Sequence, residues 1–241
     1  MAILEQLIKK ILTRGVIIAK EKISERAYKI QIHSEAVQHF DFIPGCFIRL
    51  GVGIGQEVSS TKDRVRSYSI WDINKAKNTF SLAIATASGG IGAKWVEGCS
   101  VGDTVYYKTK KGTFTIDDSA DSYLMIGDLS ALSHLYVINR YLPKNKQVKS
   151  LIYAANVAEL YADIDQQYPF DFYHIEAANT KQLLAQVDQI MPSLNGVSRV
   201  YIAGDSRDCI ALNTYFRKGL QYNPKRIKTK PFWNPTKKGL E

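Results

Sequence analysis

Four consecutive residues, Arg66-Ser67-Tyr68-Ser69, combine a cation, an aromatic ring and hydroxyl groups in one short segment. If this segment is a strand, alternation of side chains places Arg66 and Tyr68 on the same face. Further along the chain runs the Gly-rich stretch Ser88 to Trp95, whose backbone N–H groups can line a phosphate site. A ring that can stack on a planar group, an Arg and a phosphate-binding loop together indicate a bound flavin nucleotide.

Short strands separated by turn residues would position these groups. Alternating and apolar runs predict strands at 28–32, 46–50, 67–71, 79–85, 104–108 and 113–116. The turn signals Gly102-Asp103 and Lys111-Gly112 separate the last of them. Because no helix pattern intervenes between the regularly spaced strands, we expect a six-stranded antiparallel barrel over residues 1–119.

Strands and helices alternate in the second half of the sequence. Tyr123 to Ile126 is a continuous apolar run, typical of a strand that is buried on both faces. The pattern continues with strands at 149–154, 172–177 and 199–203 and with helices at 130–141, 159–167, 181–191 and 207–220. This alternation predicts a parallel-sheet α/β domain over residues 120–241, so that the fold class is β followed by α/β.

Two acidic turns follow strands of the predicted parallel sheet. Gly127-Asp128 comes after its first strand and Gly204-Asp205 after its last. Ligands of such sheets gather at the carboxyl ends of the strands, so we expect a nucleotide crevice there. Each turn taken alone is equally compatible with an Asp that caps the following helix. The sequence contains no G-x-G-x-x-G fingerprint of a dinucleotide site.

The composition excludes several classes of protein. The chain has 241 residues and 45% hydrophobic residues, and no segment approaches the roughly 18 apolar residues that a membrane span needs. Apolar spacing in residues 1–14 predicts an amphipathic helix rather than a signal peptide. Cys46, Cys99, Cys209 and four His show no metal-binding spacing. We therefore expect free thiols in a reducing cytoplasm and no metal site.

The positive charge is concentrated at the end of the sequence. From Arg217 onward there are eight Lys or Arg and one acid, which is +7 of the formal net charge of +9. This segment is either a solvated tail or a site for an anionic ligand. Nucleic acid is the less favoured ligand, because no base-reading motif accompanies the basic residues.

The motifs in this order resemble those of the siderophore-interacting proteins, which are FAD-dependent ferric-siderophore reductases of the ferredoxin-reductase superfamily. The family's R-x-Y-[ST] strand is similar to Arg66 to Ser69, and its G-P-A-S-x-W loop is similar to Gly90 to Trp95. Its G-D-E-T-A-L segment resembles Gly127 to Leu132, and its A-G-E turn resembles Ala203 to Asp205. The resemblance covers nearly the whole chain.

The resemblance implies FAD as the cofactor and assigns residues to it. Arg66 would bind its phosphate, Tyr68 would stack on the isoalloxazine and Ser69 would bond near the reactive nitrogen, while backbone N–H groups at Gly92 and Ala93 would hold the diphosphate. The full set of implied cofactor-binding residues is Arg66, Ser67, Tyr68, Ser69, Gly90, Gly92, Ala93, Trp95, Asp128, Ser130, Gly204 and Asp205.

The resemblance also implies cations that face an anionic siderophore. Arg49 and Lys111 match two such family positions. Lys230 is assigned with them as one of the lysines able to replace the family Arg that is missing after Phe232-Trp233, the others being Lys228, Lys237 and Lys238. Other departures from the family pattern are Trp71 in place of Arg, Ala93 in place of Ser, Leu129 in place of an acid, Ser133 in place of Pro, and Asn234 at the position of the missing Arg.

The activity implied by the resemblance is electron transfer from NAD(P)H, or from ferredoxin, through FAD to Fe(III), in a cytoplasmic monomer with no catalytic side chain. Alternatives are a flavin or ferredoxin reductase with another acceptor, and a flavoprotein that binds anionic ligands without turnover. The nicotinamide preference stays open. Arg207 and Lys181 are candidates for a 2′-phosphate, and Ala154-Ala155-Asn156 lacks the acid typical of NAD sites.

Overall fold

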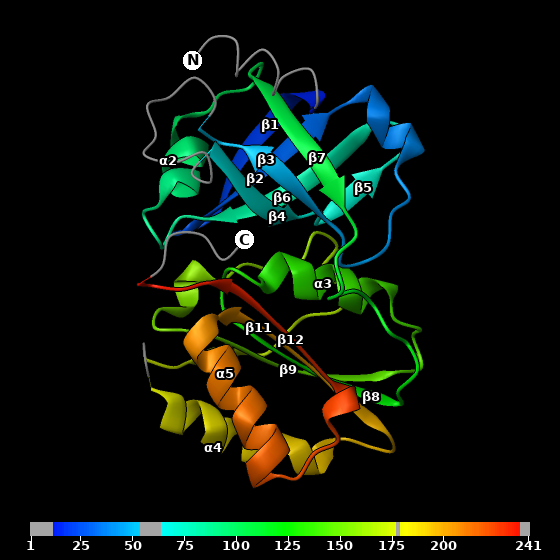
Figure 1. Ribbon diagram of the computed structural model, residues 1–241, viewed down its shortest axis with the longest axis vertical. Helices are drawn as coiled ribbons and strands as arrows, with labels where there is room; N and C mark the ends of the chain where they lie inside the picture. The colour runs from blue at the N-terminus through cyan, green and yellow to red at the C-terminus, as the bar shows by residue number, and fades with distance from the viewer. Residues whose placement is uncertain (1–11, 54–63, 177–178, 237–241) are drawn as a thin grey trace. The chain divides into compact units, whose positions relative to one another are not determined.

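The computed structural model describes residues 12–53, 64–176 and 179–236 (Figure 1). They form two compact units that divide between Thr113 and Phe114, so that the boundary expected after residue 119 falls inside the second unit. Most of the helix predicted over residues 1–14 lies outside the described residues. Its last two residues, Thr13 and Arg14, begin a strand instead.

The first unit is an antiparallel sheet of seven strands, one more than predicted, in the order β4-β3-β7-β1-β2-β6-β5. Only Ile70 and Trp71 separate its two edge strands, β4 and β5. The N–H of Ile70 bonds the Cys46 carbonyl at 3.2 Å, and the N–H of Trp71 bonds the Ser81 carbonyl at 2.9 Å. The chain thus passes directly from one edge of the sheet to the other and closes it into a barrel. The strands are β1 (Thr13–Ser24), β2 (Ala27–His33), β3 (Phe47–Gly51), β4 (Val65–Ser69), β5 (Asp72–Asn74), β6 (Thr79–Ala85) and β7 (Thr104–Lys110).

Alternation along the strands fills the barrel with apolar side chains. Ile30, Ile48, Leu50 and Leu82 are fully buried within it. Burial of each such side chain stabilises the fold by about 1.5–3 kcal/mol. One helix, α2 (Ile91–Gly98), adds Val96 to the same core.

Three details of the first unit differ from the prediction. The three-residue strand β5 was not predicted, because only one of its residues, Ile73, is apolar. β1 was not predicted as a strand, because its second half, which includes Lys20-Glu21-Lys22, is polar on both sides. The segment 113–116 is not a strand, because its backbone bonds side chains rather than a neighbouring strand. The carbonyl of Thr115 accepts from the Tyr201 hydroxyl at 3.1 Å and from Lys228 Nζ at 2.9 Å.

The second unit is a parallel sheet of five strands in the order β10-β9-β8-β11-β12. Leu124 and Ile126 of β8 pack in the cluster that contains α4 and α5, whereas a Cβ on Gly127 would contact Leu135 of α3. Because alternate side chains face opposite sides, helices cover both faces of the sheet. The strands are β8 (Ser122–Gly127), β9 (Gln147–Ala154), β10 (Phe172–His174), β11 (Ser198–Asp205) and β12 (Ile227–Trp233). The helices are α3 (Leu132–Tyr141), α4 (Thr180–Ile190) and α5 (Ser206–Thr214), with a π-helical turn at Tyr215–Gly219. The antiparallel and parallel sheets together confirm the predicted fold class.

Two elements of the second unit were predicted wrongly. No helix forms over 159–167, because this segment is tied to α3: the Tyr161 carbonyl accepts from the Tyr136 hydroxyl at 2.9 Å, and the buried Asp163 pairs with Arg140 at 3.3 Å. The strand β12 was not predicted, because it is polar and contains Pro231. It is an edge strand, where Pro is tolerated. The predicted strand 172–177 is shorter and ends at His174.

Among the described residues, no helix is both long and apolar enough to cross a membrane.

Candidate functional site

The strand motif and the Gly-rich loop meet in the first unit. Arg66 and Tyr68 lie half-buried on one face of β4, opposite Leu50 and Ile48 of β3. A Cβ placed on Gly92, in the first turn of α2, would collide with the Tyr68 hydroxyl and lie 3.7 Å from the Arg66 side chain. Two segments that are separate in the sequence therefore converge at Gly92, where only a residue without a side chain fits.

The first turn of α2 offers backbone N–H groups to an anion. Gly90 is the N-cap and has no side chain that could accept from them. The first backbone N–H to donate within the helix is that of Lys94, which bonds the Gly90 carbonyl at 3.0 Å. The N–H groups of Ile91, Gly92 and Ala93 come before it and have no acceptor within the helix. Such N–H groups and the helix dipole favour a phosphate. With the Arg66 cation and the Tyr68 ring beside them, these residues fit the diphosphate and the ring system of FAD.

The remaining predicted cofactor residues of this unit differ in where they lie. Ala93 is buried, and Trp95 packs against the barrel core. Ser67 is exposed and Ser69 is buried, both on the face of β4 opposite to Arg66 and Tyr68. The structure thus brings Arg66 and Tyr68 to Gly92, but it does not bring Ser67 there. Trp71, which replaces a family Arg, is 2% exposed and belongs to the core.

The two predicted substrate cations of the first unit differ in their surroundings. Arg49 is exposed on β3. Lys111 lies 2.5 Å from Asp41 in an exposed ion pair, and its hydrogen bond lowers the pKa of the Asp41 carboxyl. The charge of Lys111 is therefore partly neutralised within the chain.

The four predicted residues of the second unit come together at the carboxyl ends of β8 and β11. Asp128 accepts hydrogen bonds from Ser130 N (2.8 Å), Ser130 Oγ (2.5 Å), Asp205 N (2.8 Å) and Trp233 Nε1 (2.7 Å). Gly204 has φ +128°, and a Cβ there would overlap the Asp128 carboxylate. Burial raises the pKa of Asp128, and the four donors oppose this rise. The cluster joins the ends of β8, β11 and β12. That these residues bind a nucleotide stays a prediction.

Two carboxylates near this cluster, those of Asp205 and Asp208, have partners of their own. Asp205 caps α5 by accepting from the Arg207 N–H at 2.9 Å, and its carboxylate also binds the Arg207 guanidinium at 2.5 Å. Asp208 accepts from the Tyr153 hydroxyl at 2.8 Å, and burial raises its pKa. Sequence reasoning missed Tyr153 and Asp208. The sequence signal that could have found Asp208 is its position, three residues after Asp205.

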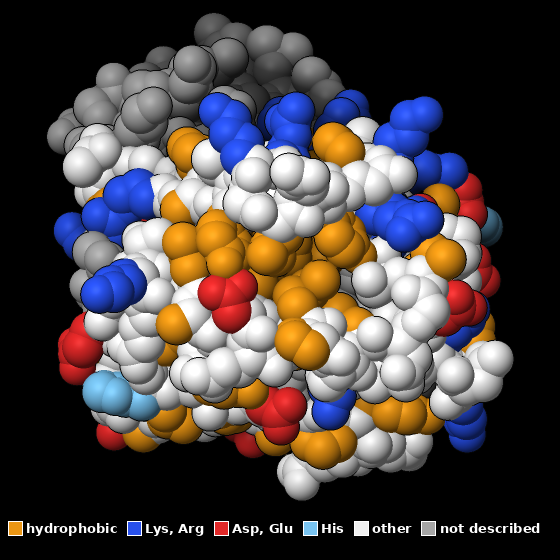
Figure 2. All heavy atoms as spheres, turned by 90° about the horizontal axis from the view of Figure 1, so that it is seen from below, with side chains coloured by type: hydrophobic (Ala, Val, Ile, Leu, Met, Phe, Trp, Pro, Cys, Tyr) orange, Lys and Arg blue, Asp and Glu red, His pale blue; other side chains and the backbone are white. Residues whose placement is uncertain are grey.

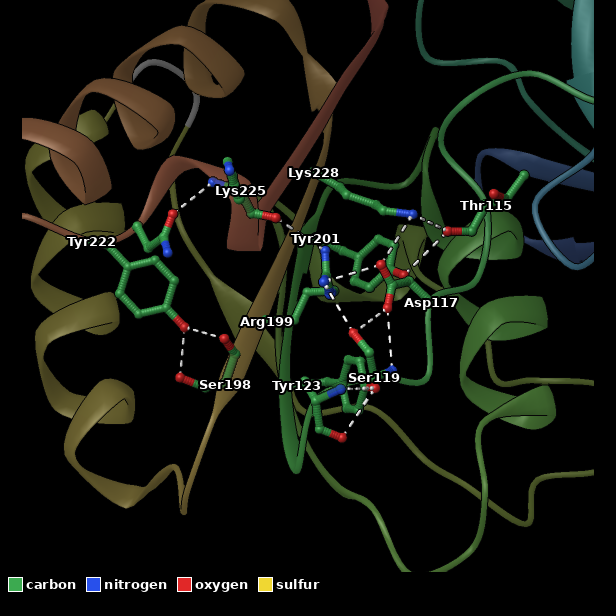
Figure 3. Close-up of polar contacts among 12 residues, drawn as sticks. Thr115, Asp117, Ser119, Tyr123, Ser198, Arg199, Tyr201, Tyr222, Lys225 and Lys228 are labelled. Carbon is green, nitrogen blue, oxygen red and sulfur yellow. Dashed lines mark hydrogen bonds and ion pairs between the residues drawn. The ribbon is translucent and has the colours of Figure 1, made fainter.

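The lysines of β12 have different surroundings. Lys228 donates to the Thr115 carbonyl and lies 3.9 Å from Asp117, which also pairs with Arg199 at 3.0 Å (Figure 3). Burial lowers the pKa of Lys228. This network fastens the segment before β8 to β11 and β12, so Lys228 is not available to a ligand. Lys230 is exposed and lies opposite Ala203 in the sheet. Lys237 and Lys238 lie outside the described residues.

Three further observations concern surface charge, possible metal ligands and the cysteines. On the face drawn in Figure 2, Lys and Arg side chains occur singly or in small groups among uncharged and acidic ones, rather than in one continuous stripe. In the described part of the chain, no three His, Cys, Asp or Glu are grouped so that they could hold a metal ion. The three cysteines are free and buried, and burial raises the pKa of each thiol.

Family models match both units. Residues 14–116 match the oxidoreductase FAD-binding domain, and residues 120–236 match the siderophore-interacting protein model. The second unit thus matches the family whose motifs the sequence resembles. The two matched domains together support FAD-dependent electron transfer.

Solved structures of siderophore-interacting proteins share the fold of this chain. A siderophore utilization protein from T. fusca has a TM-score of 0.79 at 16% identity and covers 95% of both chains. A siderophore-interacting protein from Aeromonas hydrophila has a TM-score of 0.75 at 15% identity, over 94% of this chain and 93% of that one.

Curated relatives of this chain are fungal reductases. NADH-cytochrome b5 reductase 1 of Candida albicans is 31% identical over 140 residues, which is 54% of this chain and 47% of the relative. The corresponding protein of Debaryomyces hansenii is 30% identical over 136 residues, again 47% of its length. The chain spans about half the length of these relatives.

Proposed function

We propose that this protein is an FAD-dependent reductase of ferric siderophores, a cytoplasmic monomer that takes electrons from NADH or NADPH, or from a ferredoxin. The observation that carries the proposal is the convergence of Arg66, Tyr68 and Gly92 in a chain whose second unit matches the siderophore-interacting family model. The convergence at Gly92 supports a bound flavin, and the match to the family model supports a ferric siderophore as the electron acceptor.

FAD, when bound, supplies the conversion of a two-electron hydride donor into single electrons. The chain's own residues bind and orient: Arg66 and the N–H groups of Ile91, Gly92 and Ala93 bind the diphosphate, and the Tyr68 ring holds a planar group against β4. For each hydride, two Fe(III) become Fe(II) and one proton is released. No side chain is needed as a nucleophile or general acid, since no covalent bond of the siderophore breaks.

The cationic residues fit the proposed substrate class. Ferric catecholates are polyanions, and complementary charge raises both encounter rate and selectivity. Arg49 and Lys230 are exposed cations on different units. Lys111 is a weaker candidate, because it is paired with Asp41.

A second function is favoured by the curated relatives, which are named for the reduction of cytochrome b5. In that case the acceptor is a protein, and ferric siderophores are poor substrates.

Comparison of acceptors tests the proposal. The purified protein is first assayed for FAD content, in wild type and in Arg66→Ala, where we expect FAD to be lost. Wild-type turnover with NADH or NADPH is then measured with a ferric siderophore, cytochrome b5, ferredoxin and free flavin. Faster turnover with the siderophore than with the other three supports the proposal. Faster turnover with cytochrome b5 supports the second function instead.

A further inference from the structure

A lysine of β1 lies on the core-facing side of the barrel sheet. Lys20 is directly opposite Ile30 of β2, and directly opposed residues of an antiparallel pair point to the same side. Ile30 is fully buried in the barrel core. The half-buried Lys20 therefore leaves the sheet on its apolar side, where a charged group needs polar partners.

A β-bulge gives Lys20 this orientation. The register between β1 and β2 shifts between Ile17 and Ala19, which makes Ile18 an extra residue of β1. Ile17 is fully buried, whereas Ile18 is 42% exposed. In an uninterrupted strand, alternation would put Ala19 on the core side after Ile17. The extra residue puts Lys20 there instead, and re-aiming a side chain is a known use of a bulge.

The ammonium group of Lys20 lies at the carboxyl end of α2. Its Nζ donates to the Glu97 carbonyl at 2.9 Å and to the Cys99 carbonyl at 2.8 Å. The last carbonyls of a helix have no partner within it, and they form the negative end of the helix dipole. The same Nζ lies 5.2 Å from the centre of the Tyr28 ring, in the range of a cation–π contact. Lys20 thus ties this end of α2 to β1 and β2.

The opposite end of α2 is the candidate phosphate site. The helix has eight residues, so its two ends are about 12 Å apart. Its first turn approaches β4 so closely at Gly92 that a Cβ there would collide with the Tyr68 hydroxyl. A small shift of α2 would therefore change this contact and move the N–H groups of Ile91, Gly92 and Ala93 together.

We propose that Lys20 is a positioning residue for the FAD diphosphate: by holding the carboxyl end of α2, it keeps the N–H groups of the first turn where the phosphate binds. The inference rests on the bound FAD of the proposed function. Lys20 acts through the helix, because its ammonium group binds the end that is remote from the phosphate. Its charge also complements the helix dipole, which favours an anion at the amino end.

Reconstitution of the full chain with FAD tests this role. The protein is freed of FAD, and the dissociation constant is measured by the quenching of flavin fluorescence as FAD is added back. The control Lys22→Met removes the same charge from an exposed position on the same strand and should match wild type. We expect Lys20→Met to bind FAD about tenfold more weakly, because two charge-assisted hydrogen bonds are lost. Lys20→Arg should keep most of the affinity, since a guanidinium carries the charge and enough donors for two carbonyls.

A double-variant cycle with Gly92→Ala separates positioning from a general loss of stability. Because Gly92→Ala disturbs the same turn, adding Lys20→Met to it should weaken FAD binding by about threefold or less. Equal losses in the two backgrounds would overturn the inference. The same conclusion follows if Lys20→Met binds FAD as tightly as wild type does, or if Lys20→Arg binds it as weakly as Lys20→Met does. Each of these results, in a wild type that binds FAD, refutes only the role of Lys20, whereas wild type that binds no FAD refutes the proposed function as well.

Discussion

Trp233, the last residue of β12, donates its indole N–H to the carboxylate of Asp128 at the end of β8, across 2.7 Å. The strand β11 lies between these two in the sheet, and its Asp205 N–H binds the same carboxylate at 2.8 Å. The Asp128 side chain therefore joins the ends of three strands.

The family's aromatic-Trp-Arg motif has lost its Arg here. Asn234 stands in that position, and its side chain bonds Ser206 at 2.5 Å.

We expect Asp128→Asn to lower the free energy of unfolding by about 1–3 kcal/mol, because the amide group would present its own N–H to donors that now share a carboxylate. Trp233→Phe should remove one of those hydrogen bonds and lower it by a smaller amount. Urea unfolding of both single variants and the double variant would show coupling of at least about 0.5 kcal/mol. Asp118→Asn, at an exposed position, is the control. Additive effects would show that the two side chains do not interact.

Gly92→Ala should reduce FAD occupancy, because its methyl group would collide with the Tyr68 hydroxyl. Gly98→Ala in the same helix is a matched control, since nothing lies within 4 Å of a Cβ there. Removing the hydroxyl in Gly92→Ala/Tyr68→Phe leaves the nearest ring carbon 3.4 Å away and should restore occupancy. The measurement is the ratio of FAD to protein after purification. If Gly92→Ala retains FAD as well as Gly98→Ala does, the close contact is irrelevant to the cofactor.

Acid should destabilise the second unit through His134. This side chain is 3% exposed, its Nε2 lies 2.7 Å from the Phe114 carbonyl, and burial lowers its pKa from 6.5 to about 4. Folding therefore favours the neutral ring, and the unfolded chain binds more protons between these two values. Stability is complete above pH 6.5 and falls as the pH drops toward 4, by up to about 3 kcal/mol.

Denaturant unfolding at pH 7.5 and pH 5 checks this expectation in wild type and in His134→Gln. The loss of stability between the two pH values should be smaller in the variant, although the variant is less stable at both. An equal loss in the two proteins would assign the acid sensitivity to other groups.

The Arg207–Asp205 pair bears on the choice of nicotinamide cofactor. Because the guanidinium is held by Asp205, we expect Arg207→Gln to leave the ratio of the dissociation constants for NADP⁺ and NAD⁺ within about twofold of wild type. Titration of both nucleotides against the FAD-loaded protein measures this ratio. A selective loss of NADP⁺ affinity would show that Arg207 leaves Asp205 to bind the 2′-phosphate.

Local patterns in the sequence were sufficient to predict which chemical groups lie around Gly92. The alternation of Arg66 and Tyr68 on a strand follows from the sequence alone, and a Gly-rich run indicates backbone N–H groups that can line a phosphate site. The helix α2 that presents these groups was not predicted. The Gly-Asp turns after buried strands likewise located Asp128 and Asp205 at one edge of the sheet.

Other features depend on contacts between segments that are distant in the sequence, and local patterns could not predict them. Segment 159–167 has helical spacing, yet its polar groups bond α3, which outweighs a marginal local propensity. The availability of Lys228 depends on Asp117 and on the Thr115 carbonyl, both distant in sequence. Likewise, Arg49 and Lys108 are directly opposite each other only because of the register between β3 and β7, which no local pattern shows.

The central claim is tested most directly by following the visible spectrum of the FAD-loaded protein without oxygen. NADH or NADPH is added first, or a reduced ferredoxin if neither acts, and then a ferric siderophore together with a chelator that reports Fe(II). We expect the flavin absorbance to bleach with the donor and to return with the siderophore, while two Fe(II) appear per flavin. Flavin that stays reduced after the siderophore is added, but is reoxidised by cytochrome b5, would contradict it.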